Sequence, residues 1–290
     1  MSVYDERFYL SKDGLRLFYR DYPSQSAKTP VLCIPGLTRN ARDFDFIAAH
    51  IARTRRVLVT DLRGRGRSAY DPDAVNYSVP VETRDVVQLV SELNLPKVVV
   101  LGTSRGGVIA MTMASFAPGI VAGAILNDMG ALLEASGLER IYQVLRSPPS
   151  FVSWEDAAQA LRRNNERLFP NVSEDRWREF ARALYREHDG RIVGNYDPKF
   201  PQAILEGSGT NPRTGTGAAD LWKWFAALRG VPTLVLRGEN SELLSAGTVA
   251  EMKARKPDLV TLTVKDRGHV PFLDEPEAVA AIDALLSGID

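Results

Sequence analysis

Short apolar runs alternate with helix-like stretches along most of the chain. Six of these runs have the length and apolar content of strands buried on both faces. They are Val31–Ile34, Arg56–Thr60, Lys97–Leu101, Gly123–Asn127, Thr233–Leu236 and Val260–Val264. Strands that alternate with helices predict a mostly parallel sheet, in which ligands bind at the carboxyl ends of the strands. The pattern therefore predicts an α/β fold whose functional residues follow the strands.

A hairpin is expected near the N-terminus. Arg7–Leu10 and Leu15–Tyr19 flank the dipeptide Asp13-Gly14, which is typical of a tight turn between antiparallel strands. Together with the six buried runs, this hairpin predicts a mostly parallel, eight-stranded sheet flanked by helices.

The alternation breaks after the sixth strand, where the pattern becomes helical. Helices are expected at Leu138–Leu145, Trp154–Phe169 and Ser173–His188, followed by a turn-rich stretch from Gly207 to Gly217. We predict a core domain of residues 1–129 and 218–290, and a helical cap, residues 130–217, inserted over the strand ends as a lid. Five apolar or aromatic residues of this insertion either line a pocket or pack the interior of the cap: Leu138, Tyr142, Phe151, Trp154 and Tyr196.

The segment Gly102–Gly107 has the sequence of a nucleophile elbow. It follows the apolar run Val98–Leu101 and precedes the helical pattern Val108–Phe116. In a G-x-S-x-G turn the glycines let strand and helix pass closely, and the serine hydroxyl projects from the sheet. We therefore expect Ser104 to be a nucleophile. The backbone N–H of Arg105, in the first turn of the helix, would then donate to a developing oxyanion.

Three histidines are present, and one has the setting of a catalytic base. His50 lies in an amphipathic helical pattern, and His188 lies in a polar stretch expected to end a helix. His269 instead follows the strand candidate Val260–Val264 and a short polar loop. A histidine in a loop after a late strand can take the proton of Ser104 and return it to the leaving group.

A carboxylate should orient the imidazole of His269 from another strand end. The loop after Thr233–Leu236 offers Glu242, which we prefer, and Glu239, which lies nearer the strand. Asp128 is the competing candidate because it follows the sixth strand, whose end also faces the predicted site. In a structural role, Asp128 would instead be a buried hydrogen-bonding or capping acid.

Several segments in the same order make the chain resemble the α/β-hydrolase family. They are Cys33–Leu37, Asp61–Ser68, the elbow at Ser104, Arg237–Glu242 and Asp266–His269. The resemblance implies a hydrolase core with a cap after the sixth strand. Many members have His-Gly in the oxyanion loop where this chain has Pro35-Gly36, which implies that the second oxyanion donor is the backbone N–H of Leu37. The acid after the seventh strand is more often Asp in the family, whereas this chain has Glu242.

Composition excludes several other classes of function. The arginines of Asp61–Ser68 suggest phosphate binding in isolation, but 36 basic residues balance 36 acidic ones, so no basic field favours nucleic acid. No G-x-x-x-x-G-K-[ST] motif occurs, and one cysteine with three scattered histidines gives no metal-ligand spacing. We expect no cofactor and no metal.

The sequence predicts where in the cell the protein is found. Residues 1–7 contain no apolar signal core, and no run reaches the length of a membrane span. A single cysteine, Cys33, offers no internal disulfide. These features predict a cytoplasmic protein whose partner is a small-molecule substrate, without nucleic acid or membrane, and leave monomer and homodimer open.

The motifs together predict a serine hydrolase that cleaves a carboxylic ester or lactone through an acyl-enzyme. Arg39, close to the oxyanion loop, is a candidate to bind a substrate carboxylate, or else pairs with Asp43 or Asp61. A C–C bond hydrolase and a cofactor-free perhydrolase would use the same triad. A small-molecule receptor without turnover is the alternative from another class.

Overall fold

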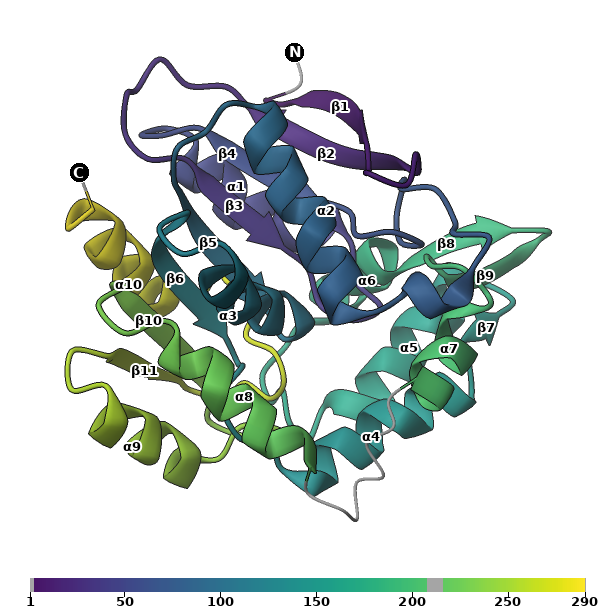
Figure 1. Ribbon diagram of the computed structural model, residues 1–290. Coiled ribbons are helices and arrows are strands. Elements are labelled where there is room, and N and C mark those ends of the chain that lie inside the picture. Colours follow the sequence, from purple (N-terminus) through teal and green to yellow (C-terminus); the bar gives the residue numbers. More distant parts are fainter. Residues whose placement is uncertain (1–2, 208–215, 290) are drawn as a thin grey trace.

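The computed structural model describes residues 3–207 and 216–289. An eight-stranded sheet with the order β1-β2-β4-β3-β5-β6-β10-β11 forms its centre (Figure 1). The strands are β1 Asp5–Leu10, β2 Arg16–Tyr22, β3 Val31–Ile34, β4 Val57–Thr60, β5 Val98–Thr103, β6 Val121–Asn127, β10 Thr233–Gly238 and β11 Val260–Val264. The pairs β1–β2 and β2–β4 are antiparallel, and the other pairs are parallel. The predicted mostly parallel, eight-stranded sheet and its N-terminal hairpin are confirmed.

Helices cover both faces of this sheet because successive strand residues point to opposite sides. Leu32 and Val100 pack against one helical layer, and Val31 and Val99 pack against the other. The first layer is α2 Val79–Glu92, α3 Arg105–Phe116 and α8 Thr216–Ala226, which stand before the sheet in Figure 1, and the second is α1 Asp45–Ile51 and α10 Pro276–Ser287. Helix α9 Ala246–Arg255 and the 3₁₀ helices η1 Ala41–Phe44 and η2 Ala74–Asn76 complete this part. None of the described helices is both long and apolar enough to cross a membrane.

The segment between β6 and α8 forms a group of elements beside the sheet (Figure 1). Its elements are α4 Ala135–Arg146, β7 Ser150–Phe151, α5 Trp154–Asn165, α6 Glu174–Leu184, β8 Tyr185–His188, β9 Arg191–Gly194 and α7 Phe200–Gly207. It has a small sheet, β7-β9-β8, and an apolar cluster around Phe169 and Trp177. Residues 208–215, in the stretch expected to be turn-rich, lie outside the described residues.

The helix expected through His188 ends earlier than the sequence pattern predicts. Helix α6 starts as expected, with the Ser173 hydroxyl accepting from the Arg176 N–H at 3.2 Å, but it ends at Leu184. The next four residues form β8 and pair with β9 across Asp189-Gly190, whose φ angles are +47° and +68°. Positive φ at both turn residues is the geometry that Asp-Gly favours in a two-residue hairpin. The expectation of a continuous helix is therefore wrong, because strand pairing satisfies these backbone groups instead.

Candidate active site

Ser104 occupies a tight turn between β5 and α3. Its φ of +51° and ψ of −115° lie outside the regions that most residues adopt. A Cβ on Gly102 would lie 2.3 Å from the carbonyl oxygen of Gly106, and one on Gly106 would lie 2.0 Å from that of Ile34. Only glycine allows such close passage, so the sequence produces the strand, turn and helix of the predicted elbow.

His269 connects Ser104 to a buried carboxylate. Its Nε2 lies 2.9 Å from Ser104 Oγ, and its Nδ1 lies 2.7 Å from Asp128 Oδ2. Asp128 is fully buried, whereas the His269 side chain is 19% exposed. In the tautomer that fits both contacts, Nδ1–H donates to Asp128 and Nε2 accepts the Ser104 hydroxyl proton. This arrangement can accept and return one proton at the serine.

Asp128 is held by the last residue of β10 and by the loop that follows this strand. Its φ of +51° places it just after β6 in a left-handed conformation, which Asp tolerates better than most residues. The Gly238 N–H donates to Asp128 Oδ1 at 2.7 Å, and the Ser241 hydroxyl donates to Oδ2 at 2.6 Å. These charge-assisted hydrogen bonds fix the carboxylate in the orientation that His269 requires.

Glu242 does not contact His269, so its preferred assignment as the acid is wrong. Its carboxylate is 28% exposed and pairs with Arg140 at 3.4 Å and with Arg167, both from the inserted segment. Glu239, the other acid of this loop, accepts from the Asp266 backbone N–H at 3.1 Å. The ends of β6 and β10 are neighbours in the sheet, so an acid from either strand could have reached the histidine, and the one from β6 does.

Two residues that sequence reasoning did not identify anchor the histidine loop. Glu275 accepts from the backbone N–H groups of Phe272 and Leu273, each at 3.0 Å. Asn127 is fully buried, and its Nδ2 donates to the carbonyl oxygen of Pro271 at 3.1 Å. The loop after His269 is thereby fixed from its own C-terminal side and from the end of β6.

The residues expected to form the oxyanion hole lie beside Ser104. A Cβ on Gly36 would lie 3.7 Å from Ser104 Cβ, which places Gly36 against Ser104. Leu37 follows Gly36, and Arg105 is the first residue of α3. Within residues 3–207 and 216–289, neither of their backbone N–H groups has a hydrogen-bond acceptor. Both amides are therefore available as donors.

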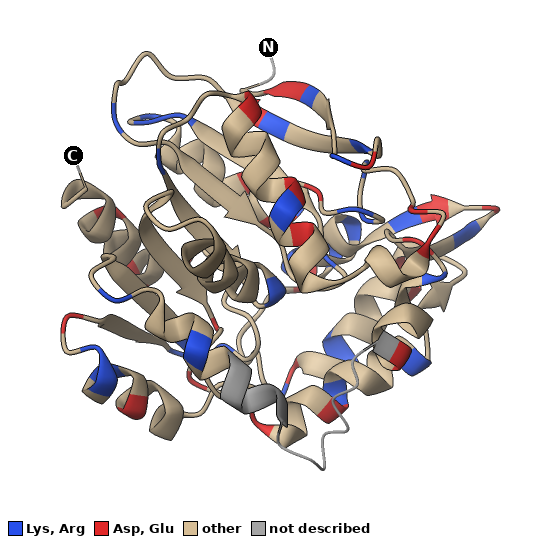
Figure 2. Cartoon of the chain, in the orientation of Figure 1, with Lys and Arg blue, Asp and Glu red and all other residues tan. Residues whose placement is uncertain are grey.

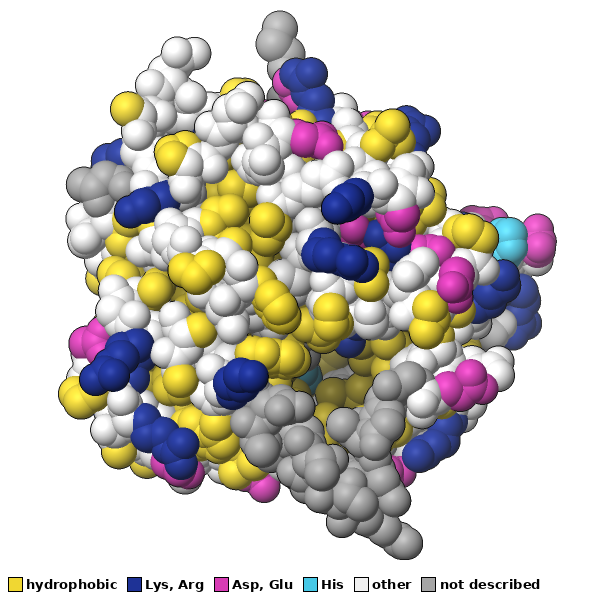
Figure 3. Space-filling view, in the orientation of Figure 1, with side chains coloured by type: hydrophobic (Ala, Val, Ile, Leu, Met, Phe, Trp, Pro, Cys, Tyr) yellow, Lys and Arg dark blue, Asp and Glu magenta, His cyan; other side chains and the backbone are white. Residues whose placement is uncertain are grey.

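A small cavity of about 60 Å³ has both charged and apolar lining residues. Thr103, Asn127 and Val270 line it, and they are the sequence neighbours of Ser104, Asp128 and His269. Arg39 also lines it, but its guanidinium pairs with Asp43 through contacts of 2.6 and 2.8 Å. Arg39 therefore forms the ion pair with Asp43, the alternative to binding a substrate carboxylate. The space-filling view shows a hollow with mostly hydrophobic visible walls and a histidine at its edge (Figure 3).

The five apolar candidates of the insertion separate into two groups. Leu138, Tyr142 and Tyr196 belong to the same apolar cluster as Leu37. Phe151 and Trp154 pack in the cluster inside the inserted segment. The first group is therefore positioned close to the oxyanion loop, whereas the second stabilises the insertion itself.

The remaining histidines and the overall charge do not add to this site. His50 Nε2 lies 2.9 Å from Asp283 on α10, and the His188 side chain is 54% exposed. Among the described residues, no group of three His, Cys, Asp or Glu side chains is placed to hold a metal ion. Acidic and basic residues are interspersed over the core and the inserted segment (Figure 2).

The chain is similar to known hydrolases over most of its length. The model of the alpha/beta hydrolase family matches residues 31–282. A 3-hydroxybutyrate-oligomer hydrolase from Cupriavidus necator is 36% identical over 284 residues, 96% of each chain. A crystal structure of an alpha/beta hydrolase from Novosphingobium aromaticivorans superposes with a TM-score of 0.92 at 38% identity, covering 100% of both chains. An N-formylmaleamate deformylase from Pseudomonas putida is 24% identical, with 94% of each chain covered.

Proposed function

Because the chain belongs to the alpha/beta hydrolase family, we propose that it is a serine hydrolase of small carboxylic esters. The observation that carries this proposal is the continuous Asp128–His269–Ser104 hydrogen-bonded chain, with contacts of 2.7 and 2.9 Å. A protein that only binds a ligand needs no serine, imidazole and carboxylate in this alignment.

In the first half of the reaction, Ser104 Oγ attacks the ester carbonyl carbon while His269 Nε2 takes its proton. The carbonyl oxygen becomes an oxyanion that accepts hydrogen bonds from the Leu37 and Arg105 amides. Asp128 stabilises the imidazolium that has formed. The intermediate collapses, the bond between the carbonyl carbon and the alkoxy oxygen breaks, and His269 protonates the departing alcohol.

In the second half, water replaces the alcohol. His269 removes a proton from a water molecule that attacks the acyl-enzyme carbonyl, and the same two amides stabilise the second oxyanion. The bond between Ser104 Oγ and the acyl carbon then breaks, His269 returns the proton to Ser104, and the carboxylic acid leaves. No cofactor is needed for either half.

We further propose that the substrates are esters between short hydroxy acids. The relative that is 36% identical over 96% of both chains is named for 3-hydroxybutyrate oligomers, which are linear esters. The apolar cluster of Leu37, Leu138 and Tyr142 suits the methyl and methylene groups of such a chain. We propose residues 130–217 as the cap that selects among these substrates.

The decisive experiment combines covalent labelling with turnover. The wild-type protein and Ser104→Ala are treated with a fluorophosphonate probe and mapped by peptide mass spectrometry. Both are assayed on p-nitrophenyl acetate and butyrate, on a 3-hydroxybutyrate dimer and trimer, and on β- and γ-butyrolactone. We expect an adduct on Ser104, turnover of the dimer and trimer, and no turnover by Ser104→Ala at an unchanged melting temperature.

The alternatives give different results in the same assay. Turnover of lactones with none of linear esters would assign a lactonase. An adduct on Ser104 without hydrolysis of any ester would direct the search to C–C bond hydrolysis and perhydrolysis. Neither adduct nor turnover by the folded wild-type protein would contradict the proposal and favour a receptor.

A further inference from the structure

Arg65 contacts the oxyanion loop from a fully buried position. Its Nε donates to the carbonyl oxygen of Leu37 at 2.9 Å, and its Nη1 donates to Glu82 Oε1 at 2.6 Å. Both the Arg65 and the Glu82 side chains are 0% exposed. The Leu37 peptide is therefore tied, through one guanidinium, to a carboxylate on α2.

The other oxygen of the same carboxylate reaches the nucleophile elbow. Arg105 Nε donates to Glu82 Oε2 at 2.6 Å, and Arg105 Nη2 donates to the carbonyl oxygen of Tyr77 at 3.2 Å. Glu82 thus connects Leu37 and Arg105, which are far apart in the sequence. It contacts Arg105 directly and reaches Leu37 through Arg65. Leu37 and Arg105 are the two residues whose amides are proposed to stabilise the oxyanion.

The charges of this cluster are maintained at neutral pH. Burial by itself would raise the pKa of Glu82, but the Arg105 and Arg65 guanidiniums hold that pKa below its ordinary value. Burial and the nearby Arg105 lower the pKa of Arg65 to about 10, which still leaves Arg65 protonated. Ionised partners make stronger and more directional hydrogen bonds than neutral ones.

The glycines on either side of Arg65 allow the close packing that buries its side chain. Gly64 has a φ of +74°, and a Cβ there would lie 2.5 Å from the Tyr77 ring. A Cβ on Gly66 would lie 2.2 Å from the Asp61 carboxylate. Only glycine fits at both positions, so the Gly-Arg-Gly sequence is required for the loop to approach so closely.

The inserted segment covers the same loop. Gly66 N–H donates to the carbonyl oxygen of Asn195 at 2.9 Å, and Asp197 N–H donates to that of Gly64 at 2.8 Å. The Arg65 guanidinium carbon lies 4.0 Å from the centre of the Phe200 ring on α7. Arg65 is thereby held by the inserted segment in addition to its hydrogen bonds with Leu37 and Glu82.

We propose that Glu82 is a positioning residue that sets the distance between the two oxyanion donors. It holds Arg105 directly, and it holds Leu37 through Arg65. The inference rests on the proposed serine hydrolase function. Glu82 is buried and takes no part in bond making. Its contribution acts through the Leu37 and Arg105 amides, which stabilise the transition state more than the bound substrate.

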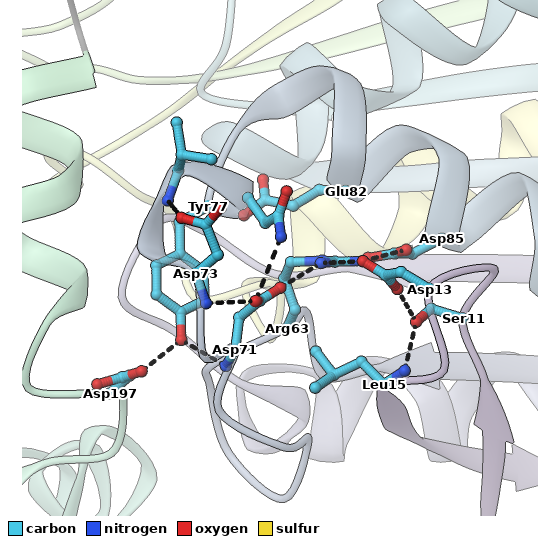
Figure 4. Close-up of polar contacts among 12 residues, drawn as sticks. Ser11, Asp13, Leu15, Arg63, Asp71, Asp73, Tyr77, Glu82, Asp85 and Asp197 are labelled. Carbon is cyan, nitrogen blue, oxygen red and sulfur yellow. Dashed lines mark hydrogen bonds and ion pairs between the residues drawn. The ribbon is translucent and has the colours of Figure 1, made fainter.

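A second buried ion pair, whose carboxylate also lies on α2, provides a matched control. Arg63, two residues before Arg65, is 1% exposed and pairs with Asp85, Asp71 and Asp13. The close-up shows this cluster around Arg63, with Asp85 reaching it from α2 and Glu82 nearby on the same helix (Figure 4). The Arg63 carbonyl oxygen accepts from Arg65 Nη1 at 2.7 Å, but among the described residues no hydrogen bond or ion pair joins the Asp85 carboxylate to Leu37, Arg65 or Arg105. Loss of Asp85 also removes a buried carboxylate from an arginine, but without touching the oxyanion loop.

The experiment compares Glu82→Gln with Asp85→Asn on whichever ester the wild-type enzyme hydrolyses. Each variant is characterised by its melting temperature, kcat, KM, fluorophosphonate labelling rate and inhibition constant for phenylboronic acid, whose serine adduct is tetrahedral. For Glu82→Gln we expect kcat to fall by about 10- to 100-fold with KM within about threefold, and boronate affinity to weaken with it. For Asp85→Asn we expect kcat within about threefold of the wild type at a lower melting temperature.

A second variant keeps the test informative if Glu82→Gln does not fold. Arg105 is 14% exposed, and Arg105→Met leaves Glu82 paired one to one with Arg65. This variant keeps its backbone amide and loses the side-chain hydrogen bonds to Glu82 and to the Tyr77 carbonyl. We expect about a tenfold fall in kcat and a matching loss of boronate affinity.

The outcomes separate this inference from the proposed function. Labelling and turnover by the wild type together with an equally active, folded Glu82→Gln or Arg105→Met would overturn only the positioning role. An equal fall in kcat for Asp85→Asn would also overturn it, because the effect would then follow from general destabilisation. A wild-type protein without labelling or turnover would overturn both proposals.

Discussion

Two carboxylates follow neighbouring parallel strands of this protein and have different surroundings. Asp128 comes directly after β6, is fully buried, and accepts from the Gly238 amide, the Ser241 hydroxyl and His269. Glu242 lies in the loop after β10, is 28% exposed, and pairs with two arginines of the inserted segment. One carboxylate orients an imidazole, whereas the other joins the core to the insertion.

The difference shows that a strand end defines a region but does not select the residue that acts there. The end of β10 and the loop after it hold Asp128 through the Gly238 N–H and the Ser241 hydroxyl. A buried carboxylate needs such donors, since an unsatisfied buried charge is costly. The Glu242 carboxylate is instead stabilised by solvent and by two arginines, without a contact to His269.

The largest expected effect separates these two acids in catalysis. Asp128→Asn removes the acceptor that fixes the His269 tautomer and stabilises the imidazolium, so kcat should fall on the order of 10⁴-fold. Glu242→Gln should leave kcat within about threefold of the wild type, because its partners are exposed arginines. Steady-state kinetics on the same ester measure both. A larger loss for Glu242→Gln than for Asp128→Asn would reverse the assignment.

A smaller effect should follow from removing one donor to Asp128. Ser241→Ala deletes the hydroxyl 2.6 Å from Asp128 Oδ2, and we expect kcat to fall by about tenfold, as for loss of one hydrogen bond to a charged group. The control is Ser245→Ala, which removes the N-cap of α9 and should lower the free energy of unfolding by about 1 kcal/mol without changing kcat. Equal kcat values for both variants would show that Ser241 does not support the triad.

Asp13 extends the comparison to an exposed carboxylate whose arginine partner is buried. Hydrogen bonds from Arg63 and Ser11 lower the pKa of Asp13 from 3.8 to about 2. A lowered pKa means that the stabilisation is present above pH 3.8 and is lost as the pH falls towards 2. Because Asp13 is 47% exposed, solvent screening limits the effect to about 1 kcal/mol. Urea unfolding of the wild type and Asp13→Asn should differ at pH 6 and converge near pH 2, and a constant difference would contradict this account.

The smallest effect concerns Glu242 and stability. Arg140 and Arg167 are 38% and 75% exposed, so Glu242→Gln should lower the free energy of unfolding by less than about 1 kcal/mol. In 1 M salt the difference from the wild type should disappear, because salt screens exposed ion pairs. A difference that persists at high salt would indicate that this contact is more than a screened surface pair.

Much of the fold could be predicted from local patterns. The apolar runs and the Asp13-Gly14 turn predicted the eight strands, and the glycines around Ser104 predicted the elbow. The same kind of signal, Asp189-Gly190, marks the hairpin that was predicted as helix. The helical pattern predicted up to His188 competed with this turn signal, and the pairing of β8 with β9 shows that the turn prevailed.

The sequence by itself determined the alternation of strands and helices, the strained turn at Ser104 and the small set of groups that could serve it. These features depend on side-chain periodicity and on glycine, which act over a few residues. Tertiary structure alone selected Asp128 over Glu242 and brought Glu82 between Arg65 and Arg105. Both outcomes depend on which polar groups become buried together, and burial is a property of the packed chain.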